Sequence, residues 1–164
     1  MNKLVSFSIE KMRKLDISVN SAGILQQYPF VELPIETRDK TIEVNLRGPF
    51  LMIKAVLPHM IENRFGRIIN IASQLAQIGG VELAHYTASK AGMIAMTKSL
   101  AREVGVHGIT TNCIAPGPIE TDMISHLDKE WKETKEKELA IPRFGQVDEV
   151  SPSAVFLASE PDGN

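Results

Sequence analysis

The sequence predicts an α/β fold built on a parallel sheet. Short apolar runs alternate with longer segments whose apolar residues recur at helical spacing, and each short run ends in residues typical of turns. The order strand, helix, strand, helix, strand, helix is typical of parallel strands with helices packed on the faces of their sheet. We expect one domain, because 164 residues with 43% hydrophobic and 23% charged content suit a single ordinary core.

The expected elements follow from the spacing of apolar residues along the chain. Continuous apolar runs bounded by turn residues predict strands, and apolar residues three or four positions apart predict helices. The elements expected on these grounds are strands at 15–19, 67–72 and 109–115, long helices at 37–62 and 86–104, one or two short charged helices within 119–139, and a last helix at 148–158.

The first long helix contains two residues that disfavour regular helix. Pro49 and Pro58 lack an N–H and are expected to kink or locally loosen it, and Gly66 is expected to stop it. In residues 128–138, by contrast, acidic and basic side chains alternate at i,i+4 spacing, which is typical of a solvated helical face.

Composition excludes several classes of function. A formal net charge of −2 without a basic tract gives no phosphate-tracking surface for nucleic acid. The apolar runs fall far short of the ~20 residues that span a bilayer, and the N-terminus lacks the apolar core of a signal peptide, so the expected location is the cytoplasm. No metal site is expected, because no Cys/His cluster accompanies the four histidines, His59, His85, His107 and His126.

Cys113 is the only cysteine, so the chain can form no internal disulfide. It lies in the apolar stretch 109–115, which favours a packed thiol over a nucleophile.

The three predicted strands each end in residues suited to chemistry. Asn20 to Gly23 follow the first strand, Ser73 follows the second, and Pro116 and Gly117 follow the third. Because open α/β sheets bind ligands at the carboxyl edge of their strands, we expect a site there.

Tyr86 and Lys90 are four residues apart on a predicted helix and therefore share a face. A nearby ammonium favours the phenolate and moves the phenol pKa from about 10 toward neutrality, where proton transfer is efficient. That shift of about three units corresponds to roughly 4 kcal/mol. The alternative for the pair taken alone is a surface tyrosine beside a surface lysine.

Several motifs, in order and at consistent intervals, resemble one family. The turn 20–23 resembles Asn-Asn-Ala-Gly with Ser21 in place of the second asparagine, and residues 44–46 supply a helical asparagine. Ser73 precedes Tyr86 by 86 − 73 = 13 residues, and the segments 86–92, 115–123, 142–145 and 155–159 complete the pattern. On these residues the chain resembles the short-chain dehydrogenases/reductases, closest to the 3-oxoacyl-carrier-protein reductases and their small-ketone relatives.

The resemblance implies an NAD- or NADP-dependent oxidoreductase that interconverts a ketone and a secondary alcohol. Tyr86 would donate or remove the proton, and Lys90 would lower the Tyr86 pKa and hold the nicotinamide ribose. Ser73 would hydrogen-bond the substrate oxygen, and Asn45 would hold a water linking Lys90 to solvent. The implied cofactor-binding residues are Asn20, Ala22, Gly23, Tyr86, Lys90, Pro116, Gly117, Ile119 and Thr121, with no metal.

The resemblance also implies a mobile substrate flap at about 125–139. Met123 and Trp131 are candidate contacts to an apolar substrate, although Trp131 could equally pack on a surface helix.

The resemblance covers strands four to six of the family fold, so we expect a partial Rossmann-type, doubly wound parallel sheet across residues 1–164. Residues 1–15 resemble the end of the helix before the fourth strand. The glycine-rich turn and the last strand of the family have no counterpart, and the outer edges of strands 16–20 and 109–114 are expected to lack their neighbours. Ser18 is a polar departure within an apolar strand.

Partners are expected to be a small ketone or alcohol, possibly on an acyl carrier, and a second copy of the chain. Arg64 and Arg67 could attract an acidic carrier or could simply be solvated, and His107 stands where carrier-protein reductases often have arginine. The helices 37–62 and 86–104 correspond to the family's interface in homodimers and homotetramers. The alternative function is a catalytically inactive fragment that serves only in association.

Overall fold

The computed structural model describes residues 2–125 and 128–160, and within them three strands form one parallel sheet. The strands are β1 (Ile17–Asn20), β2 (Gly66–Ile71) and β3 (Ile109–Ile114), in the spatial order β1-β2-β3. The expected parallel α/β fold is confirmed. Each strand bound differs from its prediction by no more than two residues, since side-chain pattern alone does not show where pairing begins.

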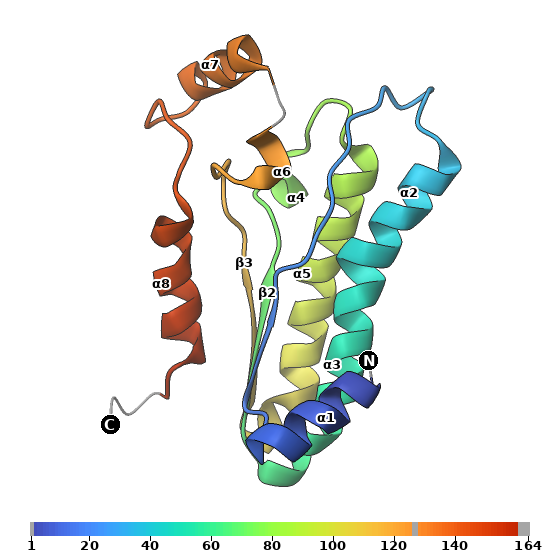
Figure 1. Cartoon of the computed structure of the whole chain (residues 1–164), viewed down its shortest axis with the longest axis vertical. Helices are drawn as coiled ribbons and strands as arrows, with labels where there is room; N and C mark the ends of the chain where they lie inside the picture. The colour runs from blue at the N-terminus through green and yellow to red at the C-terminus, as the bar shows by residue number, and fades with distance from the viewer. Residues whose placement is uncertain (1, 126–127, 161–164) are drawn as a thin grey trace.

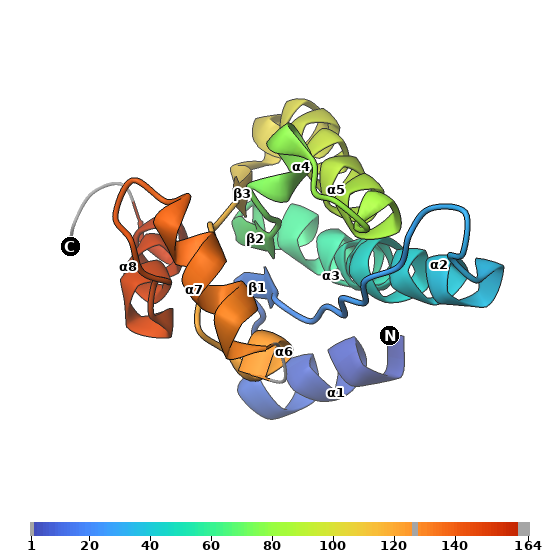
Figure 2. The same ribbon diagram turned by 90° about the horizontal axis from the view of Figure 1, so that it is seen from above.

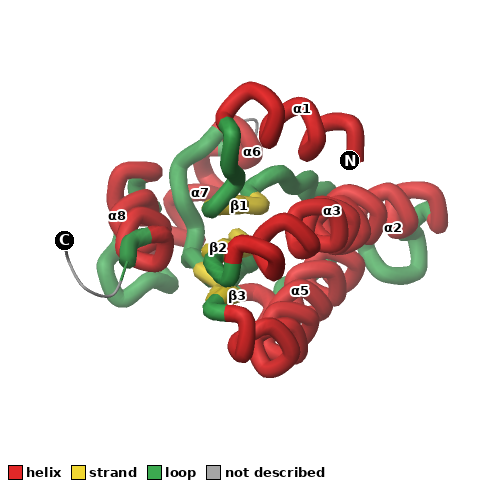
Figure 3. The backbone as a smooth tube through the Cα atoms, turned by 90° about the horizontal axis from the view of Figure 1, so that it is seen from below, coloured by secondary structure: helices red, strands yellow, loops and turns green. Residues whose placement is uncertain are grey.

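Helices cover both faces of this sheet, as the doubly wound prediction requires. α3 (Gly48–Asn63) and α5 (Ala84–Val104) lie on one face, and α8 (Val147–Ala158) lies on the other (Figure 3). α1 (Asn2–Met12) packs against α3, at the side of β1 away from β3 (Figure 2). α5 begins two residues before the predicted helix 86–104, and α8 begins one residue before the predicted helix 148–158.

Three short helices lie beyond the carboxyl end of the strands, and the first of them packs beside the start of α5 (Figure 1). They are α4 (Leu75–Ile78), α6 (Asp122–Ser125) and α7 (Lys129–Lys137). α6 and α7 confirm the short charged helices expected within 119–139, and the Asp128 carboxylate caps α7 by accepting from the Trp131 N–H. α4 was not predicted, because four residues are too few to show a helical period.

The predicted helix 37–62 is a composite of three segments. α2 (Ile35–Ile42) leads into a π-helical turn, η1 (Glu43–Arg47), and then into α3. The Gly48 N–H donates to the Glu43 carbonyl, one residue further back than in an α-helix. The expected loosening is therefore found just before Pro49, whereas Pro58 lies inside α3 without ending it.

Gly66 does not stop the helix as predicted but is the first residue of β2. α3 ends at Asn63, followed by Arg64 in the left-handed conformation with φ 52°. Gly66 is buried against Met60, and a Cβ built on it would lie 2.6 Å from the Met60 Sδ. Glycine is needed there to bring the strand close to the helix.

The core lies between α3, α5 and the sheet. Each fully buried aliphatic side chain of this kind stabilises the fold by about 1.5–3 kcal/mol. The buried members of the cluster are Val5, Ile53, Val56, Met60, Ile68, Val104 and Ile109.

Within the described residues, no strand pairs with the outer edge of β1 or of β3. In β1 the apolar side chains of Ile17 and Val19 are 47% and 50% exposed, whereas Ser18 is buried. Ser18, the polar departure from the strand pattern, thus faces the core on the α3 side of the sheet. Ile17 and Val19 face the opposite side, where they are exposed.

Candidate active site

Tyr86 and Lys90 lie on one buried face near the start of α5, as their spacing predicts. Their side chains are 6% and 3% exposed, and the Lys90 Nζ lies 5.8 Å from the centre of the Tyr86 ring. The ammonium donates a hydrogen bond of 2.8 Å to the carbonyl of Ile71, the last residue of β2. This bond ties the helix to the carboxyl edge of the sheet and excludes a solvated surface pair.

Burial dominates the protonation of both groups. It raises the pKa of Tyr86 above its ordinary value of 10.0, and a hydrogen bond with the Ser73 side chain only partly opposes that rise. It likewise lowers the pKa of Lys90, against a smaller opposing effect of Cys113. The pKa of Tyr86 is therefore raised and not moved toward neutrality as expected, because burial disfavours the charged phenolate.

Ser73 follows β2 and is buried beside the phenol of Tyr86. Its Oγ accepts a hydrogen bond of 3.2 Å from the Leu75 N–H, so the first turn of α4 fixes its orientation. The two hydroxyls, separated by 13 residues, meet because β2 ends where α5 begins. A serine and a tyrosine hydroxyl side by side can hold and protonate one carbonyl oxygen.

Asn45 is fully buried in η1 and binds the segment after β1. Its Oδ1 accepts from the Ile24 N–H at 2.8 Å, and its Nδ2 donates to the Ile24 carbonyl at 2.9 Å and to the Ser89 Oγ at 3.2 Å. Both amide hydrogens therefore have protein acceptors, and any water at this side chain would have to donate to Oδ1.

Gly23 lies where these groups converge. A Cβ built on it would lie 3.4 Å from both the Asn45 Oδ1 and the Lys90 Nζ, and 3.9 Å from the Met123 Cε. The glycine thus lets the backbone after β1 approach the ammonium closely. Met123, a predicted substrate contact on α6, is brought to the same place.

Ser89 is a site residue that motif reading did not single out. It is fully buried, accepts from Asn45, and donates a hydrogen bond of 2.6 Å to the Tyr86 carbonyl. It therefore connects the helical asparagine directly to the active-site helix. Its position three residues after the tyrosine, on the same helical face, was the available signal.

The segment after β3 forms one wall of a hollow of about 490 Å³. Ile119 makes a parallel bridge with Gly145, which closes this wall against the loop before α8. A Cβ on Gly117 would meet the Gln74 side chain at 3.4 Å, so this hollow also borders the residue after Ser73. Predicted cofactor residues in its lining are Pro116, Gly117 and Ile119.

Three other predicted cofactor residues are placed differently. The Asn20 amide donates to the Asn70 Oδ1 at 2.8 Å, so its side chain is turned into the sheet. Ala22 is exposed. Thr121 is also exposed, and its hydroxyl donates at 3.5 Å to the Ile119 carbonyl.

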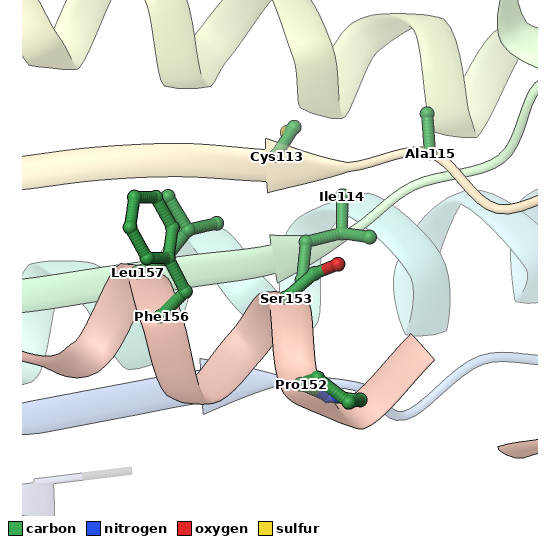
Figure 4. Close-up of a pocket in the computed structure, with 7 residues that line it drawn as sticks. All are labelled: Cys113, Ile114, Ala115, Pro152, Ser153, Phe156 and Leu157. Carbon is green, nitrogen blue, oxygen red and sulfur yellow. The ribbon is translucent and has the colours of Figure 1, made fainter. Parts of the chain in front are cut away.

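A second hollow of about 590 Å³ lies between the end of β3 and α8 (Figure 4). Ile114, Phe156 and Leu157 line it, together with Cys113, Ala115, Pro152 and Ser153. The Cys113 side chain points away from α8 toward α5, so the thiol is half-buried between sheet and helix, which agrees with packing (Figure 4). None of the predicted catalytic side chains lines this hollow.

The predicted flap is partly described. Trp131 is half-buried on α7, and Lys132 of the same helix donates to the Glu120 carboxylate at 2.8 Å. His126 and residue 127 lie outside the described residues.

Arg67 is neither solvated nor available to a carrier protein, contrary to both readings of the sequence. It is 5% exposed, and its guanidinium donates to the carbonyls of Gly66, Gly108 and Ser159. Arg64 remains exposed, whereas His107 is half-buried in η2 (Gly105–His107).

His85, beside Tyr86, is 3% exposed, and burial lowers its pKa. Across residues 2–125 and 128–160, no three His, Cys, Asp or Glu residues come close enough to hold a metal. In the same ranges no helix is long and apolar enough to cross a membrane.

Comparison with known proteins connects this geometry to named enzymes. The family model described as enoyl-(acyl carrier protein) reductase matches residues 1–163. The chain is 41% identical over 152 residues to the 3-oxoacyl-(acyl-carrier-protein) reductase FabG of Rickettsia conorii, covering 93% of this chain and 63% of that protein. It is 39% identical over 160 residues to the hydroxy(phenyl)methylsuccinyl-CoA dehydrogenase subunit BbsD of Thauera aromatica, covering 98% and 64%.

Among solved structures, a gluconate 5-dehydrogenase from Burkholderia cenocepacia in complex with NADP and tartrate superimposes with a TM-score of 0.93 at 32% identity. The match covers 96% of this chain and 63% of that one. The chain thus spans somewhat less than two thirds of the length of these relatives.

Proposed function

Because this chain belongs to the short-chain dehydrogenase/reductase family, we propose that it carries the acid–base half of an oxidoreductase that interconverts a ketone and a secondary alcohol with NAD or NADP. The observation that carries the proposal is the meeting of Ser73, Tyr86 and Lys90 at the carboxyl edge of the sheet.

The residues present fit the nicotinamide end of a dinucleotide. Gly23 keeps a side chain away from the Lys90 ammonium, since a Cβ there would lie 3.4 Å from Nζ. One N–H of the Lys90 ammonium donates to the Ile71 carbonyl, and its other two can donate to hydroxyl groups. Pro116, Gly117 and Ile119 line the neighbouring hollow and would hold the ring. A bound nicotinamide would supply or accept the hydride.

In this proposal the chain's own residues handle the proton and the oxygen. The Ser73 hydroxyl donates to the substrate oxygen and fixes its position. The raised pKa keeps the Tyr86 phenol protonated at neutral pH, which is the form needed to donate to a forming alkoxide. Lys90 holds the cofactor hydroxyls, and Asn45 and Ser89 keep the backbone at Ile24 and the helix at Tyr86 in register.

The substrate class we propose is a ketone carried on a small acid or an acyl thioester. Two of the named relatives act, by their names, on acyl-carrier or CoA thioesters, and the third on gluconate. Met123, beside Gly23, gives the site an apolar surface for the part of the substrate next to the ketone.

We further propose that two copies associate through α3 and α5. Both helices are complete in the structure. Phe50 and Leu51, neighbours on α3, are 49% and 36% exposed. Adjacent exposed apolar side chains of this size are typical of a protein–protein contact. A mass from light scattering at twice or four times 18.1 kDa would support this, and a monomer at micromolar concentration would contradict it.

The decisive experiment mixes the chain with NADH or NADPH and follows nicotinamide fluorescence and the oxidation of the cofactor by an acetoacetyl thioester, the ketone substrate. In the opposite direction, gluconate is the alcohol substrate, and the reduction of NAD or NADP is followed. Tyr86→Phe should abolish turnover and retain cofactor binding. Tyr28→Phe, the matched change at the chain's other tyrosine, should leave both within about twofold of the unchanged chain. No cofactor binding at millimolar concentration would refute the catalytic proposal and leave the association role.

A further inference from the structure

A buried polar cluster joins α5 to β2 and β3, two to three turns from the catalytic side chains. We call Asn70, Thr97, Thr111 and Cys113 the Thr97 cluster. The Thr97 Oγ1 accepts from the Asn70 Nδ2 at 2.8 Å and from the Cys113 Sγ at 3.2 Å, while donating to the Met93 carbonyl at 2.8 Å. The Thr97 carbonyl accepts from the Thr111 hydroxyl at 2.9 Å.

The cluster follows a single row across the sheet. Asn20, Asn70 and Cys113 are register partners in β1, β2 and β3, and the Asn20 amide donates to the Asn70 Oδ1. Thr97 is 2% exposed and Asn70 is fully buried, so water cannot replace these bonds without opening the core. One helical residue is therefore bonded directly to β2 and β3 near their carboxyl ends, and through Asn70 to the last residue of β1.

Thr97 shares its helical face with the catalytic pair. Tyr86, Lys90, Met93 and Thr97 are spaced by four, three and four residues, and all four are buried. Lys90 lies seven residues before Thr97, or about 10 Å along the helix axis. Its bond partner Ile71 directly follows Asn70 in β2. Two hydrogen bonds with the adjacent strand residues Asn70 and Ile71 thus hold α5 at two points along its axis, Thr97 and Lys90.

Apolar packing alone does not fix that height. Contacts between Met93, Val104 and the strands are non-directional, so a shift of α5 along its axis would exchange one set of apolar neighbours for another. Hydrogen bonds weaken steeply with distance and angle, so the same shift would break the bonds of Thr97. The cluster is the directional element of this interface.

We propose that Thr97, through Asn70, is a positioning residue that sets the axial placement of α5 and thereby holds Lys90 and Tyr86 at the height of Ser73. The inference rests on the proposed function for its catalytic consequence, but the placement itself can be measured without turnover. The hydroxyl touches no reacting atom.

The test compares Thr97→Val, which keeps the shape and removes the hydroxyl, with Thr97→Ser, which restores the hydroxyl. The matched control is Thr41→Val, because Thr41 is also fully buried but its hydroxyl bonds only the Thr37 carbonyl of its own helix. The first readout is the NMR chemical shift of the Lys90 side chain in protein labelled with carbon-13 lysine, assigned by its loss in Lys90→Met. The second is the through-space NMR contact between Lys90 and Ile71, and the third is the pair of constants kcat and KM.

We expect Thr97→Val to move the Lys90 signal, weaken its contact with Ile71, and lower kcat by about tenfold or more with KM changed less than about threefold. Thr97→Ser should restore all three, and Thr41→Val should move none. An unchanged Lys90 signal and kcat in a folded Thr97→Val protein would overturn the proposal.

If Thr97→Val does not fold, Asn70→Ala replaces it, since it removes the amide donor to the same oxygen. Asn70→Ala should then shift the Lys90 signal, and no shift in a folded Asn70→Ala protein would overturn the proposal. If the unchanged chain shows no turnover, the proposed function fails, while the lysine signal still decides the placement.

Discussion

The side-chain amide of Asn45 binds the backbone of Ile24 at both its N–H and its carbonyl, 21 residues away in sequence. This pairing is the same one that a neighbouring strand would provide, made here by a buried side chain. It holds the segment after β1 against η1 and so places Gly23 beside Lys90.

Asn45→Asp is expected to destabilise the protein, because it keeps Oδ1 as an acceptor but leaves the Ile24 carbonyl and the Ser89 hydroxyl without their donor. An unsatisfied buried polar group costs about 1–3 kcal/mol, so we expect a loss of at least about 1 kcal/mol in urea unfolding, with faster hydrogen exchange at Ile24. Asn63→Asp is the control, since the exposed Asn63 bonds only His59 within its own helix. Equal effects of the two changes would contradict this account.

Tyr86 is expected to ionise above the ordinary phenol value of 10.0, because its pKa is raised by burial. Between that value and the folded pKa, the folded state binds more protons than the unfolded state, so the stability falls as the pH rises through this range. Phenolate absorbance in the folded chain should show a late phase that Tyr86→Phe removes and Tyr28→Phe retains. A late phase that survives Tyr86→Phe would refute the assignment.

Glu149 at the start of α8 has its pKa lowered from 4.5 to about 2, first by hydrogen bonding to Arg143 and then by the Gln146 N–H. The folded pKa is below the unfolded one, so this carboxylate contributes stability above about pH 4.5 that is lost as the pH falls toward 2. Glu149→Gln should lower the urea midpoint at pH 7 and converge with the unchanged chain near pH 2.

Asp148→Asn is the control for Glu149→Gln, because it removes a neighbouring charge in the same helical turn without touching the Arg143 pair. A gap between Glu149→Gln and the unchanged chain that stays constant from pH 7 to pH 2 would show that the ion pair is not its cause.

Gly108→Ala is expected to be strongly destabilising. Gly108 has φ +74°, and a Cβ there would lie 2.5 Å from the Arg64 carbonyl oxygen. The left-handed conformation alone costs about 1–2 kcal/mol for an L-residue, and the backbone clash adds to it. Gly105→Ala is the matched control, since Gly105 has a helical φ of −55° with open space around it. This change should stabilise the protein slightly, by up to about 1 kcal/mol.

The alternation of strands and helices was predictable because apolar spacing reflects which face of each element is buried. The meeting of Ser73 and Tyr86 was also predictable, since strand ends and the helix start share one edge of a parallel sheet. Strand bounds shifted by up to two residues because hydrogen-bond pairing, which defines them, depends on a neighbour that local sequence does not show.

Other features depended on tertiary contacts without a local signature. Arg67 lies in an apolar run yet is buried by its bonds to three carbonyls. The Asn20 amide turns toward Asn70 in place of the site, because a register partner lies directly beside it. The raised pKa of Tyr86 depends on how much protein surrounds the phenol, which the i,i+4 spacing to Lys90 does not reveal.

The π-helical turn η1 carries one residue more than an α-helix would hold over the same rise. Each helical residue rotates the chain by about 100°, so the extra residue offsets the angular phase of α2 from that of α3. A deletion of Glu43, Val44, Leu46 or Arg47 would let α2 and α3 merge into one regular helix and rotate α2 by about that angle. The loop reaching Gly23 would lose its anchor, and the reaction centre would come apart although every catalytic side chain remained in the sequence.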